Sequence, residues 1–358
     1  MVRQEVGRAG AVPVSFLTRT VIWLVYTYMK RIGVAGATGL VGETLLRILE
    51  ASDYEIADLR LFASKRSAGV RVLFRDQEYE VREVSVDGFK GLDLAFFCLE
   101  NELARSFVPE VAKLCPVIDK SSEFRLKDDV PLIVPEVNPA AIKGHKNIIA
   151  NPNCTTIPLV VVLKPLEQEF GLKEVFLASY QSVSGAGRAA LEQLLYENEF
   201  LALHQNPDTK DSPFPAQIGD NLIPQIGAID GQGHSAEEKK TILETKKILS
   251  RQDLAINSTC VRVPVTVGHC LAVTCRFEKP VHPKQAVKIL GQAPGVVLKD
   301  GEQLLTPLDC RKKNDVFVSR VRQGATEKDL NLWIVCDNLY KGAATNALQI
   351  AQLLFSRK

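Results

Sequence analysis

The sequence predicts an α/β protein built from two domains, and three observations support this prediction. Apolar strand patterns alternate with helical ones from residue 31 to residue 166, which is typical of a parallel sheet covered by helices. Beyond residue 175, strand patterns follow one another with few helices between them, which indicates an α+β domain with a mixed sheet. A chain of 358 residues is long enough to form two such cores.

The first strand pattern, residues 31–35, leads through a glycine-rich turn into a helix expected over residues 43–49. Such a turn lets the backbone approach a pyrophosphate, while the first N–H groups of the helix point at it. The spacing is GxxGxxG rather than the common GxGxxG, but the strand before it and the helix after it provide the required context. We therefore predict a Rossmann-type dinucleotide-binding domain, with a cofactor loop of Gly36, Ala37, Thr38, Gly39, Leu40 and Val41.

The end of the second strand, residues 59–63, indicates which dinucleotide binds. An NAD site usually has an acidic residue here, which accepts a hydrogen bond from the ribose 2′-hydroxyl. This strand instead leads into hydroxyl and cationic side chains. The Arg66 guanidinium can bind a 2′-phosphate through paired hydrogen bonds, with Ser64 and Ser67 donating as well, so we predict NADP(H) as the cofactor. The alternative is a basic turn exposed to solvent.

A polar loop, residues 120–125, follows a strand, helix and strand expected at residues 92–99, 102–114 and 116–119. Ligands of open α/β sheets bind at the carboxyl ends of the strands. Arg125, in this loop, is therefore a candidate for binding an anion. Taken alone, the residue could equally be an ordinary surface arginine.

Cys154 lies at the junction of a short strand, residues 147–150, and a long apolar helix, residues 157–166. Unpaired N–H groups and the helix dipole at a helix N-terminus favour the thiolate form of a cysteine. The same N–H groups could hold an oxyanion during attack on a carbonyl. We therefore interpret Cys154 as a candidate nucleophile, and the alternative is an inert buried cysteine.

In the second half of the chain, the order of the expected strands and helices is typical of an α+β domain. A strand over residues 175–183 ends in a turn rich in Ser and Gly, and a helix begins near residue 188. Residues 205–235 are rich in Pro, Gly, Asp and Asn, which predicts a long loop. A capping-box pattern then opens a helix over residues 236–249. Further strands are expected at residues 259–265, 270–277, 316–322 and 332–336, and a final helix at 341–355.

Composition excludes several classes of protein. The chain is 46% hydrophobic and 24% charged with a formal net charge of +2, which gives no reason to expect nucleic acid or a membrane as a partner. Its eight cysteines form no CxxC pairs, so we predict neither a disulfide framework nor a metal site, and a cytoplasmic location. Residues 1–28 contain an apolar run that is too short to span a membrane, so we interpret them as an N-terminal extension outside the fold.

Eight short motifs, in order from Met29 onward, resemble those of the aspartate-semialdehyde dehydrogenase family. Each is loose by itself, but eight in the right order form a specific signature. One stretch departs from the family pattern: residues 98–102 are bulkier and more acidic than the small-residue turn that usually borders cofactor and phosphate. The motifs lie at residues 36–42, 64–69, 121–125, 151–155, 181–187, 237–240, 262–269 and 337–343.

The resemblance implies a reaction, a domain arrangement and an oligomer. The reaction is the NADPH-dependent, reversible reductive dephosphorylation of L-4-aspartyl phosphate to L-aspartate 4-semialdehyde through a cysteine thioester. It belongs to the biosynthesis of lysine, threonine, methionine and diaminopimelate. Residues 29–153 and 338–358 would form the NADP-binding domain, and residues 154–337 the catalytic and dimerisation domain. The protein would be a homodimer or a homotetramer.

The resemblance also implies roles for individual residues. Its motifs make Cys154 the nucleophile, His269 the acid/base and Gln181 the residue that orients the acyl intermediate. The amino-acid end of the substrate is bound by Glu237 and Arg262. The phosphate is held by Arg125, Asn153 and Lys240, and the cofactor site is completed by Ser184, Gly185 and Asn338.

Three other interpretations stay open. N-acetyl-γ-glutamyl-phosphate reductase performs the same chemistry, but its nucleophile usually lies in a Gly-Cys-Tyr type sequence, whereas Asn153 and Thr155 flank Cys154 here. A phosphorylating dehydrogenase of the glyceraldehyde type shares little beyond the Cys-Thr-Thr turn. A non-catalytic NADP-binding redox sensor on the same fold would need only the cysteine, whereas this chain also carries Arg262 and His269.

Overall fold

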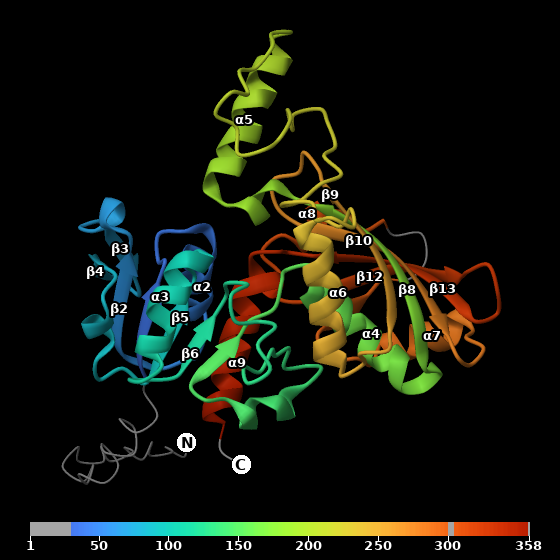
Figure 1. The fold of residues 1–358 in the computed structure, drawn as a ribbon, viewed down its shortest axis with the longest axis horizontal. Helices are drawn as coiled ribbons and strands as arrows, with labels where there is room; N and C mark the ends of the chain where they lie inside the picture. The colour runs from blue at the N-terminus through green and yellow to red at the C-terminus, as the bar shows by residue number, and fades with distance from the viewer. Residues whose placement is uncertain (1–29, 300–303, 357–358) are drawn as a thin grey trace, which may run out of the picture.

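The computed structural model describes residues 30–299 and 304–356, so the interpretation of residues 1–28 lies outside the described part of the chain. Two β-sheets form two lobes, and the C-terminal helix α9 (Thr345–Phe355) lies between them (Figure 1). The prediction of an α/β domain followed by an α+β domain with a mixed sheet is confirmed. Within the described residues, no helix combines the length and apolar character needed to cross a membrane.

The first sheet has seven strands in the order β3-β4-β2-β1-β5-β6-β7. Neighbouring strands run parallel except β3 and β4, which form an antiparallel pair at the edge. Strand order changes direction beside β1, because the chain places β2 on one side of it and β5 on the other. Ligands bind at such a switch point, beyond the carboxyl ends of the strands. The strands are β1 (Lys30–Ala35), β2 (Ile56–Ala63), β3 (Arg71–Phe74), β4 (Gln77–Glu83), β5 (Leu94–Phe97), β6 (Val117–Asp119) and β7 (Ile148–Ala150).

Helices cover both faces of this sheet, which explains its near-continuous apolar strands. Val34 of β1 shares a buried cluster with Leu45 of α2 and Ala347 of α9. Ala35, the next residue, belongs to a second cluster with Val108 of α3 on the opposite face. The helices are α2 (Leu40–Glu50) and α3 (Asn101–Val111), with short 3₁₀ helices η2 (Lys65–Ser67), η3 (Val86–Phe89) and η4 (Pro139–Gly144).

Two features of the first lobe differ from the sequence prediction. Helix α2 begins at Leu40 instead of residue 43, because Gly39 is its N-cap and the cofactor turn is correspondingly tight. The edge strands β3 and β4 were not predicted. Their side chains are mostly exposed or half-buried, so they carry little of the apolar pattern that marks a strand.

The second sheet has six strands in the order β11-β12-β13-β10-β8-β9. The pairs β8–β9 and β11–β12 are parallel and the other pairs antiparallel, so the sheet is mixed, as predicted. Strand β11 was not predicted, since it is only 3 residues long. The strands are β8 (Leu172–Gln181), β9 (Ala255–Arg262), β10 (His269–Phe277), β11 (Val296–Leu298), β12 (Val316–Gln323) and β13 (Asp329–Cys336).

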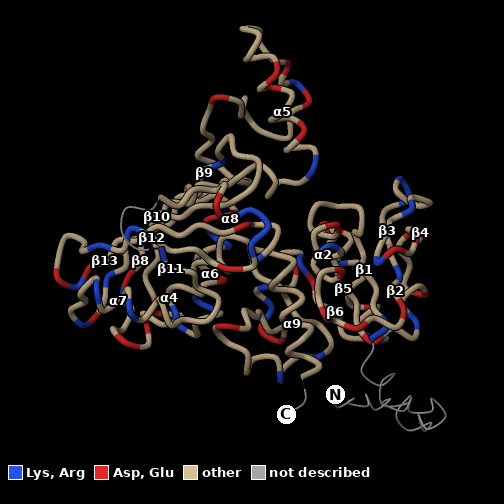
Figure 2. The backbone as a smooth tube through the Cα atoms, turned by 180° about the vertical axis from the view of Figure 1, so that it is seen from behind, with Lys and Arg blue, Asp and Glu red and all other residues tan. Residues whose placement is uncertain are grey.

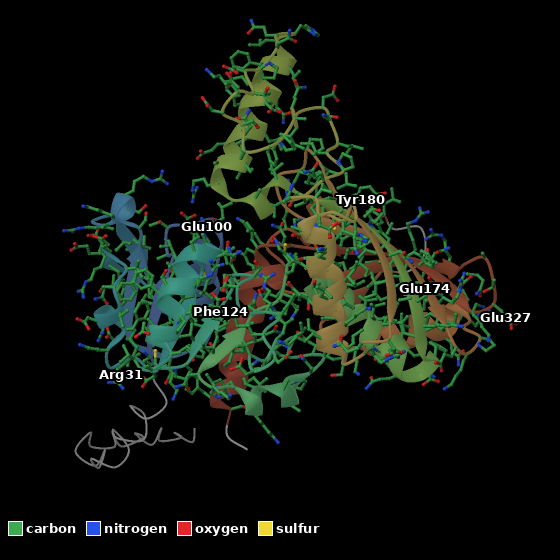
Figure 3. All side chains as sticks on the ribbon, in the orientation of Figure 1. Arg31, Glu100, Phe124, Glu174, Tyr180 and Glu327 are labelled. Carbon is green, nitrogen blue, oxygen red and sulfur yellow. The ribbon has the colours of Figure 1, made fainter. Side chains whose placement is uncertain are left out.

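Helices α4, α6 and α7 pack on one face of the second sheet, while the other face carries exposed aromatic side chains. Along β8, Leu177 is buried, whereas Phe176 and Tyr180 are 39% and 37% exposed. Figure 3 shows Tyr180 at the end of β8 nearer the first lobe and Glu174 towards the other end. Helix α5 and the loop after it project away from both sheets (Figure 1). The helices are α4 (Thr156–Phe170), α5 (Arg188–Ala202), α6 (Ala236–Leu249), α7 (Pro283–Leu290), α8 (Pro307–Cys310) and the 3₁₀ helix η5 (Val183–Ala186).

The chain returns to the first lobe through a π-helical turn, η6 (Tyr340–Ala344), where the sequence predicted the start of an α-helix. Lys341 in this turn is fully buried, and its Nζ lies 2.8 Å from both carboxylate oxygens of Glu136. Because a buried cation needs a counter-charge, this pair holds the turn in place. Elsewhere, Lys and Arg are interspersed with Asp and Glu over both lobes (Figure 2).

Candidate active site

Cys154 lies in the turn between β7 and α4, as the sequence predicted. The Asn153 side chain stabilises this turn, since its Oδ1 accepts a hydrogen bond of 2.7 Å from the Thr155 N–H. Helix α4 is buried along most of its length, which anchors the turn in the core of the second lobe. The Cys154 Sγ lies 3.3 Å from the Nε2 of His269, so the fold brings together two residues 115 positions apart.

His269 is the first residue of β10 and is fully buried. The main-chain N–H of Ser182 donates to its Nδ1 at 3.1 Å. Because a main-chain N–H can only donate, this bond favours the neutral tautomer with the proton on Nε2, facing the sulfur. The Ser182 hydroxyl also donates to Asn338 Oδ1 at 3.0 Å and so connects the imidazole environment to Asn338. Sequence reasoning missed Ser182, although it follows Gln181 within a motif.

The helix N-terminus alone would favour a thiolate at Cys154, but the surroundings of this side chain act in the opposite direction. Burial, reinforced by Glu237, raises the pKa of the Cys154 thiol to about 11, although neighbouring cations oppose this. Burial and the charge of Arg262 lower the pKa of His269 to about 3. At neutral pH the pair is therefore a thiol beside a neutral imidazole. Desolvation of the small thiolate outweighs the helix dipole, whose effect is modest and limited to the first turn.

Gln181 and Arg262 lie side by side at the ends of the parallel strands β8 and β9, where they are partners in the strand register. Arg262 is 6% exposed, and its Nη1 donates to the Ser182 carbonyl at 2.7 Å. Gly185 lies against this guanidinium and the imidazole: a Cβ there would be 3.1 Å from Arg262 Nη1 and 3.2 Å from His269 Nε2. A larger residue at this position would crowd both groups.

Helix α6 brings two predicted substrate-binding residues, Glu237 and Lys240, to the Cys154 turn. Glu237 Oε1 accepts a hydrogen bond of 2.8 Å from Asn153 Nδ2, and its Oε2 accepts one of 3.2 Å from Lys240 Nζ. Burial alone would raise the pKa of Glu237, but Lys240, Asn153 and Arg262 together lower it, so the carboxylate stays ionised. The predicted capping box is present at the start of this helix.

Arg125 is not a surface residue: it is 7% exposed and lies between the loop after β6 and helix α6. Its Nη1 donates to Glu244 Oε1 at 2.9 Å, and its Nη2 donates to the Lys120 carbonyl at 2.5 Å. The other oxygen of Glu244 accepts a bond of 2.7 Å from the Asn153 main-chain N–H. Sequence reasoning missed Glu244, although its position seven residues after Glu237 puts both carboxylates on the same face of a helix.

The predicted cofactor loop lies at the switch point of the first sheet. Each glycine of the motif is required for a different structural reason. Gly36 has a φ of +82°, a conformation that other residues rarely adopt. A Cβ at Gly42 would overlap the Gly36 carbonyl, so only glycine lets α2 approach this closely. Gly39, the N-cap of α2, offers no side-chain cap and leaves the first helical N–H groups for a phosphate. The loop therefore fits the pyrophosphate of a dinucleotide.

The remaining predicted cofactor residues fall into two groups. Ser184 and Asn338 are buried in the hydrogen-bond network of His269, where Asn338 Nδ2 donates to Ser184 Oγ at 3.0 Å. The other group lies just beyond the end of β2, where a 2′-phosphate could reach it from solvent. It consists of the exposed Ser64 and Arg66 and the half-buried Ser67.

The unusual turn at residues 98–102 contacts the cofactor loop through its backbone. A Cβ at Gly36 would lie 2.5 Å from the Cys98 carbonyl oxygen, so the same glycine also accommodates this turn. Asn101 donates to Ser122 Oγ at 2.8 Å and accepts from the Ser122 N–H at 3.0 Å, which ties the turn to the loop that carries Arg125. Burial raises the pKa of the Cys98 thiol to about 11, so this second thiol is protonated at neutral pH.

Both lobes match known domain families. Residues 31–145 match the semialdehyde dehydrogenase NAD binding domain, and residues 163–341 match the semialdehyde dehydrogenase dimerisation domain. Aspartate-semialdehyde dehydrogenase of Aquifex aeolicus is 41% identical over 333 residues, which are 90% of this chain and 97% of that protein. The protein of the same name from Bacillus subtilis is 40% identical over 334 residues, which are 90% of this chain and 96% of that protein. The structure of aspartate semialdehyde dehydrogenase II complexed with ASA from Vibrio cholerae is 39% identical, with a TM-score of 0.89 over 91% of this chain and 98% of that chain. The chain therefore belongs to the aspartate-semialdehyde dehydrogenase family.

Proposed function

We propose that the protein catalyses the NADPH-dependent, reversible reductive dephosphorylation of L-4-aspartyl phosphate to L-aspartate 4-semialdehyde through a thioester at Cys154. The observation that supports this most is the pair of Cys154 Sγ and His269 Nε2, 3.3 Å apart, near three cationic side chains. Those cations, Arg262, Arg125 and Lys240, all act on the pKa of the Cys154 thiol. The reaction would serve the biosynthesis of lysine, threonine, methionine and diaminopimelate, as the resemblance implies.

Two cationic sites suit a substrate with two anionic ends. Arg262 would bind the α-carboxylate, and the ionised Glu237 would bind the α-ammonium group. Arg125 and Lys240 would bind the phosphate. Asn153 would assist with its second amide hydrogen, since the first is bonded to Glu237. An ionised carboxylate at Glu237 favours a charged amine over an acetylated one, which argues against N-acetyl-γ-glutamyl phosphate as the substrate.

The chemical step uses the sulfur as nucleophile. Attack of the Cys154 sulfur on the acyl carbon forms the S–C bond and breaks the C–O bond to phosphate. The thiol proton leaves with the phosphate as hydrogen phosphate, and a thioester remains. In its Nε2–H tautomer, His269 donates to the sulfur and stabilises the thiolate, and the same proton can stabilise the carbonyl oxygen as it becomes negative. Gln181, at the end of β8, would orient the acyl group. The acid/base role that the resemblance implies for His269 stays a prediction.

The residues present fit a dinucleotide. When bound, the dinucleotide supplies the hydride that reduces the acyl group, or accepts a hydride in the reverse direction. The pyrophosphate would lie on the loop of residues 36–41, and Ser64, Arg66 and Ser67 would bind a 2′-phosphate. Ser184, Gly185 and Asn338 would hold the nicotinamide end, since they adjoin His269. The related aspartate semialdehyde dehydrogenase from Candida albicans, with 25% identity and a TM-score of 0.70, has a structure with NADP.

The assembly would be a homodimer or homotetramer built through the second lobe, which carries the dimerisation domain. Its sheet exposes Phe176 and Tyr180 on the face opposite α4, and such aromatic side chains are enriched in protein interfaces. In this arrangement residues 29–153 and 338–358 form the cofactor domain, and residues 154–337 form the catalytic and dimerisation domain.

The proposed function is tested by following NADP reduction with aspartate 4-semialdehyde and inorganic phosphate. We expect turnover that requires both substrates, with N-acetylglutamate semialdehyde giving little activity. A preference for the acetylated substrate would reassign the chain to the related reductase. Binding of NADP without turnover of either aldehyde would favour the redox-sensor alternative.

A further inference from the structure

Glu244 is buried between the Arg125 loop and the Cys154 turn, and the reaction proposed above assigns it no role. Its side chain is 1% exposed, and its two oxygens bind two different elements of the site. Oε1 accepts from Arg125 Nη1 at 2.9 Å, and Oε2 accepts from the Asn153 main-chain N–H at 2.7 Å. One carboxylate thereby connects the proposed phosphate-binding guanidinium with the residue that precedes the nucleophile.

Ionisation of Glu244 is energetically unfavourable because its side chain is buried. Burial raises the pKa of Glu244 even though Arg125 and the Asn153 N–H act to lower it. Arg125 is also buried, and a lone buried guanidinium is far less stable than a paired one. Glu244 thus supplies the counter-charge that lets Arg125 stay inside the protein before an anionic substrate arrives.

The pair with Glu244 leaves Arg125 able to bind a further anion. Its Nε is buried and finds no hydrogen-bond partner anywhere in residues 30–299 and 304–356. Its Nη2 donates to a neutral group, the Lys120 carbonyl. A guanidinium with an unused buried donor can accept a phosphate in addition to, or in exchange for, its resident carboxylate.

We propose that Glu244 is a positioning residue that acts as the resident counter-anion of Arg125 and thereby sets the affinity of the site for phosphate. The inference rests on the proposed function, because it takes the phosphate of that reaction as the ligand of Arg125. Before phosphate binds, Glu244 holds Arg125 and the Asn153 N–H in place. Once phosphate binds, the negative charge of Glu244 weakens the complex, which allows phosphate to leave after each turnover.

The decisive variant is Glu244→Gln in the full-length protein, with inorganic phosphate as the probe and thermal unfolding as the readout. Glutamine keeps the size of the side chain but leaves Arg125 as an uncompensated buried charge until phosphate binds. We expect a lower Tm than in the wild type without phosphate and a larger increase in Tm when phosphate is added. The phosphate Kd should fall about three- to tenfold. The value of kcat should also fall, because glutamine offers one oxygen to two donors.

Glu238→Gln is the matched control on the same helix. Glu238 is 8% exposed, and its carboxylate also accepts two main-chain hydrogen bonds, from Ser235 at 2.7 Å and from Cys260 at 3.1 Å. This variant should lower the Tm while the phosphate Kd and the phosphate-induced increase in Tm stay at the wild-type values. A Glu244→Gln protein whose phosphate Kd equals or exceeds that of the wild type would overturn the proposal.

The double variant Arg125→Gln/Glu244→Gln keeps the test decisive if Glu244→Gln does not fold. This variant carries neither buried charge, so we expect its Tm to recover towards the wild-type Tm. Its phosphate Kd should be higher than the wild-type Kd, because Arg125 is missing. A double variant that is no more stable than Glu244→Gln would contradict the counter-ion role.

Thermal unfolding does not require turnover, so the two proposals can fail separately. If the wild type reduces NADP with semialdehyde and phosphate while Glu244→Gln binds phosphate like the wild type, only the role of Glu244 is wrong. If the wild type binds phosphate and shows the expected Glu244 effect but turns over no semialdehyde, only the proposed function is wrong.

Discussion

The predicted cofactor loop and the Cys154 site are built in opposite ways. The predicted cofactor loop is one continuous segment, residues 36–41, and we expect it to bind a phosphate through backbone N–H groups. The missing Cβ atoms of Gly36 and of Gly42, in the first turn of α2, allow its tight conformation. The Cys154 site takes its side chains from β8, β9, β10 and α6 and from the segments that follow β6 and β7. Most of these side chains are buried, including Arg125, Glu237 and Arg262.

This difference determines how each region responds to a substitution. A site made of backbone fails only when the chain can no longer adopt the turn. In the Cys154 site the ionisation of each group depends on its neighbours: Lys240 and Arg262 help to lower the pKa of Glu237, and Glu237 helps to raise the pKa of Cys154. A single substitution in the Cys154 site should therefore have larger effects than one in the predicted cofactor site.

The largest effect is expected when the nucleophile is removed. Cys154→Ala should lower turnover by more than about a thousandfold, because no other group can form the thioester. Dinucleotide binding should persist, since the loop is a separate segment, and NADPH fluorescence would measure it. A variant that keeps a tenth of the wild-type rate would show that the covalent mechanism is wrong.

The two buried arginines should affect different substrates. Arg262→Leu should raise the KM for semialdehyde, and Arg125→Leu should raise the KM for phosphate. Each change should weaken binding by about 2 to 5 kcal/mol, because the anionic end of the substrate loses its cationic partner in a buried site. Lysine at either position should recover only part of the loss, since a point charge cannot reproduce two parallel hydrogen bonds. Steady-state kinetics in which each substrate is varied separately would measure this. Equal increases in both KM values in both variants would contradict two separate anion sites.

At the cofactor end, Arg66→Ala should weaken NADP binding by up to about 3 kcal/mol and leave NAD binding nearly unchanged. The Arg66 side chain is exposed, so the loss of binding should be smaller than in the Cys154 site. The KM values for NADP and NAD would measure the difference. If both cofactors are affected equally, Arg66 does not bind the 2′-phosphate.

The smallest effect concerns pH and the buried imidazole, which faces Arg262, Glu237 and Cys154. The pKa of His269 is about 3 in the folded protein and 6.5 ordinarily, so between these values the unfolded state binds a proton that the folded state does not. Stability therefore falls as the pH decreases through this window, by about 2 kcal/mol between pH 6.5 and pH 5. Urea unfolding should show this loss in the wild type and in Ser64→Ala, just after the end of β2, but less of it in His269→Gln. The same loss in all three proteins would mean that His269 does not titrate as described.

Local patterns in the sequence were sufficient for much of the fold and for parts of the site. The spacing of Gly36, Gly39 and Gly42 predicts the cofactor turn, because the conformation of a tight turn depends on neighbouring residues. The capping box before α6 and the turn that carries Cys154 are local in the same sense. The edge strands β3 and β4 and the short β11 escaped prediction, because strands that bury few side chains show little periodicity.

Tertiary structure alone decided the electrostatics of the Cys154 site. Cys154 and His269 lie 115 positions apart in the sequence, and Arg125 and Glu244 lie 119 apart, so no local pattern pairs them. The N-terminus of helix α4 favours a thiolate, yet burial raises the pKa of the Cys154 thiol. A pKa depends on solvent access and on every charge within several ångströms, and the chain acquires both only when distant segments pack together.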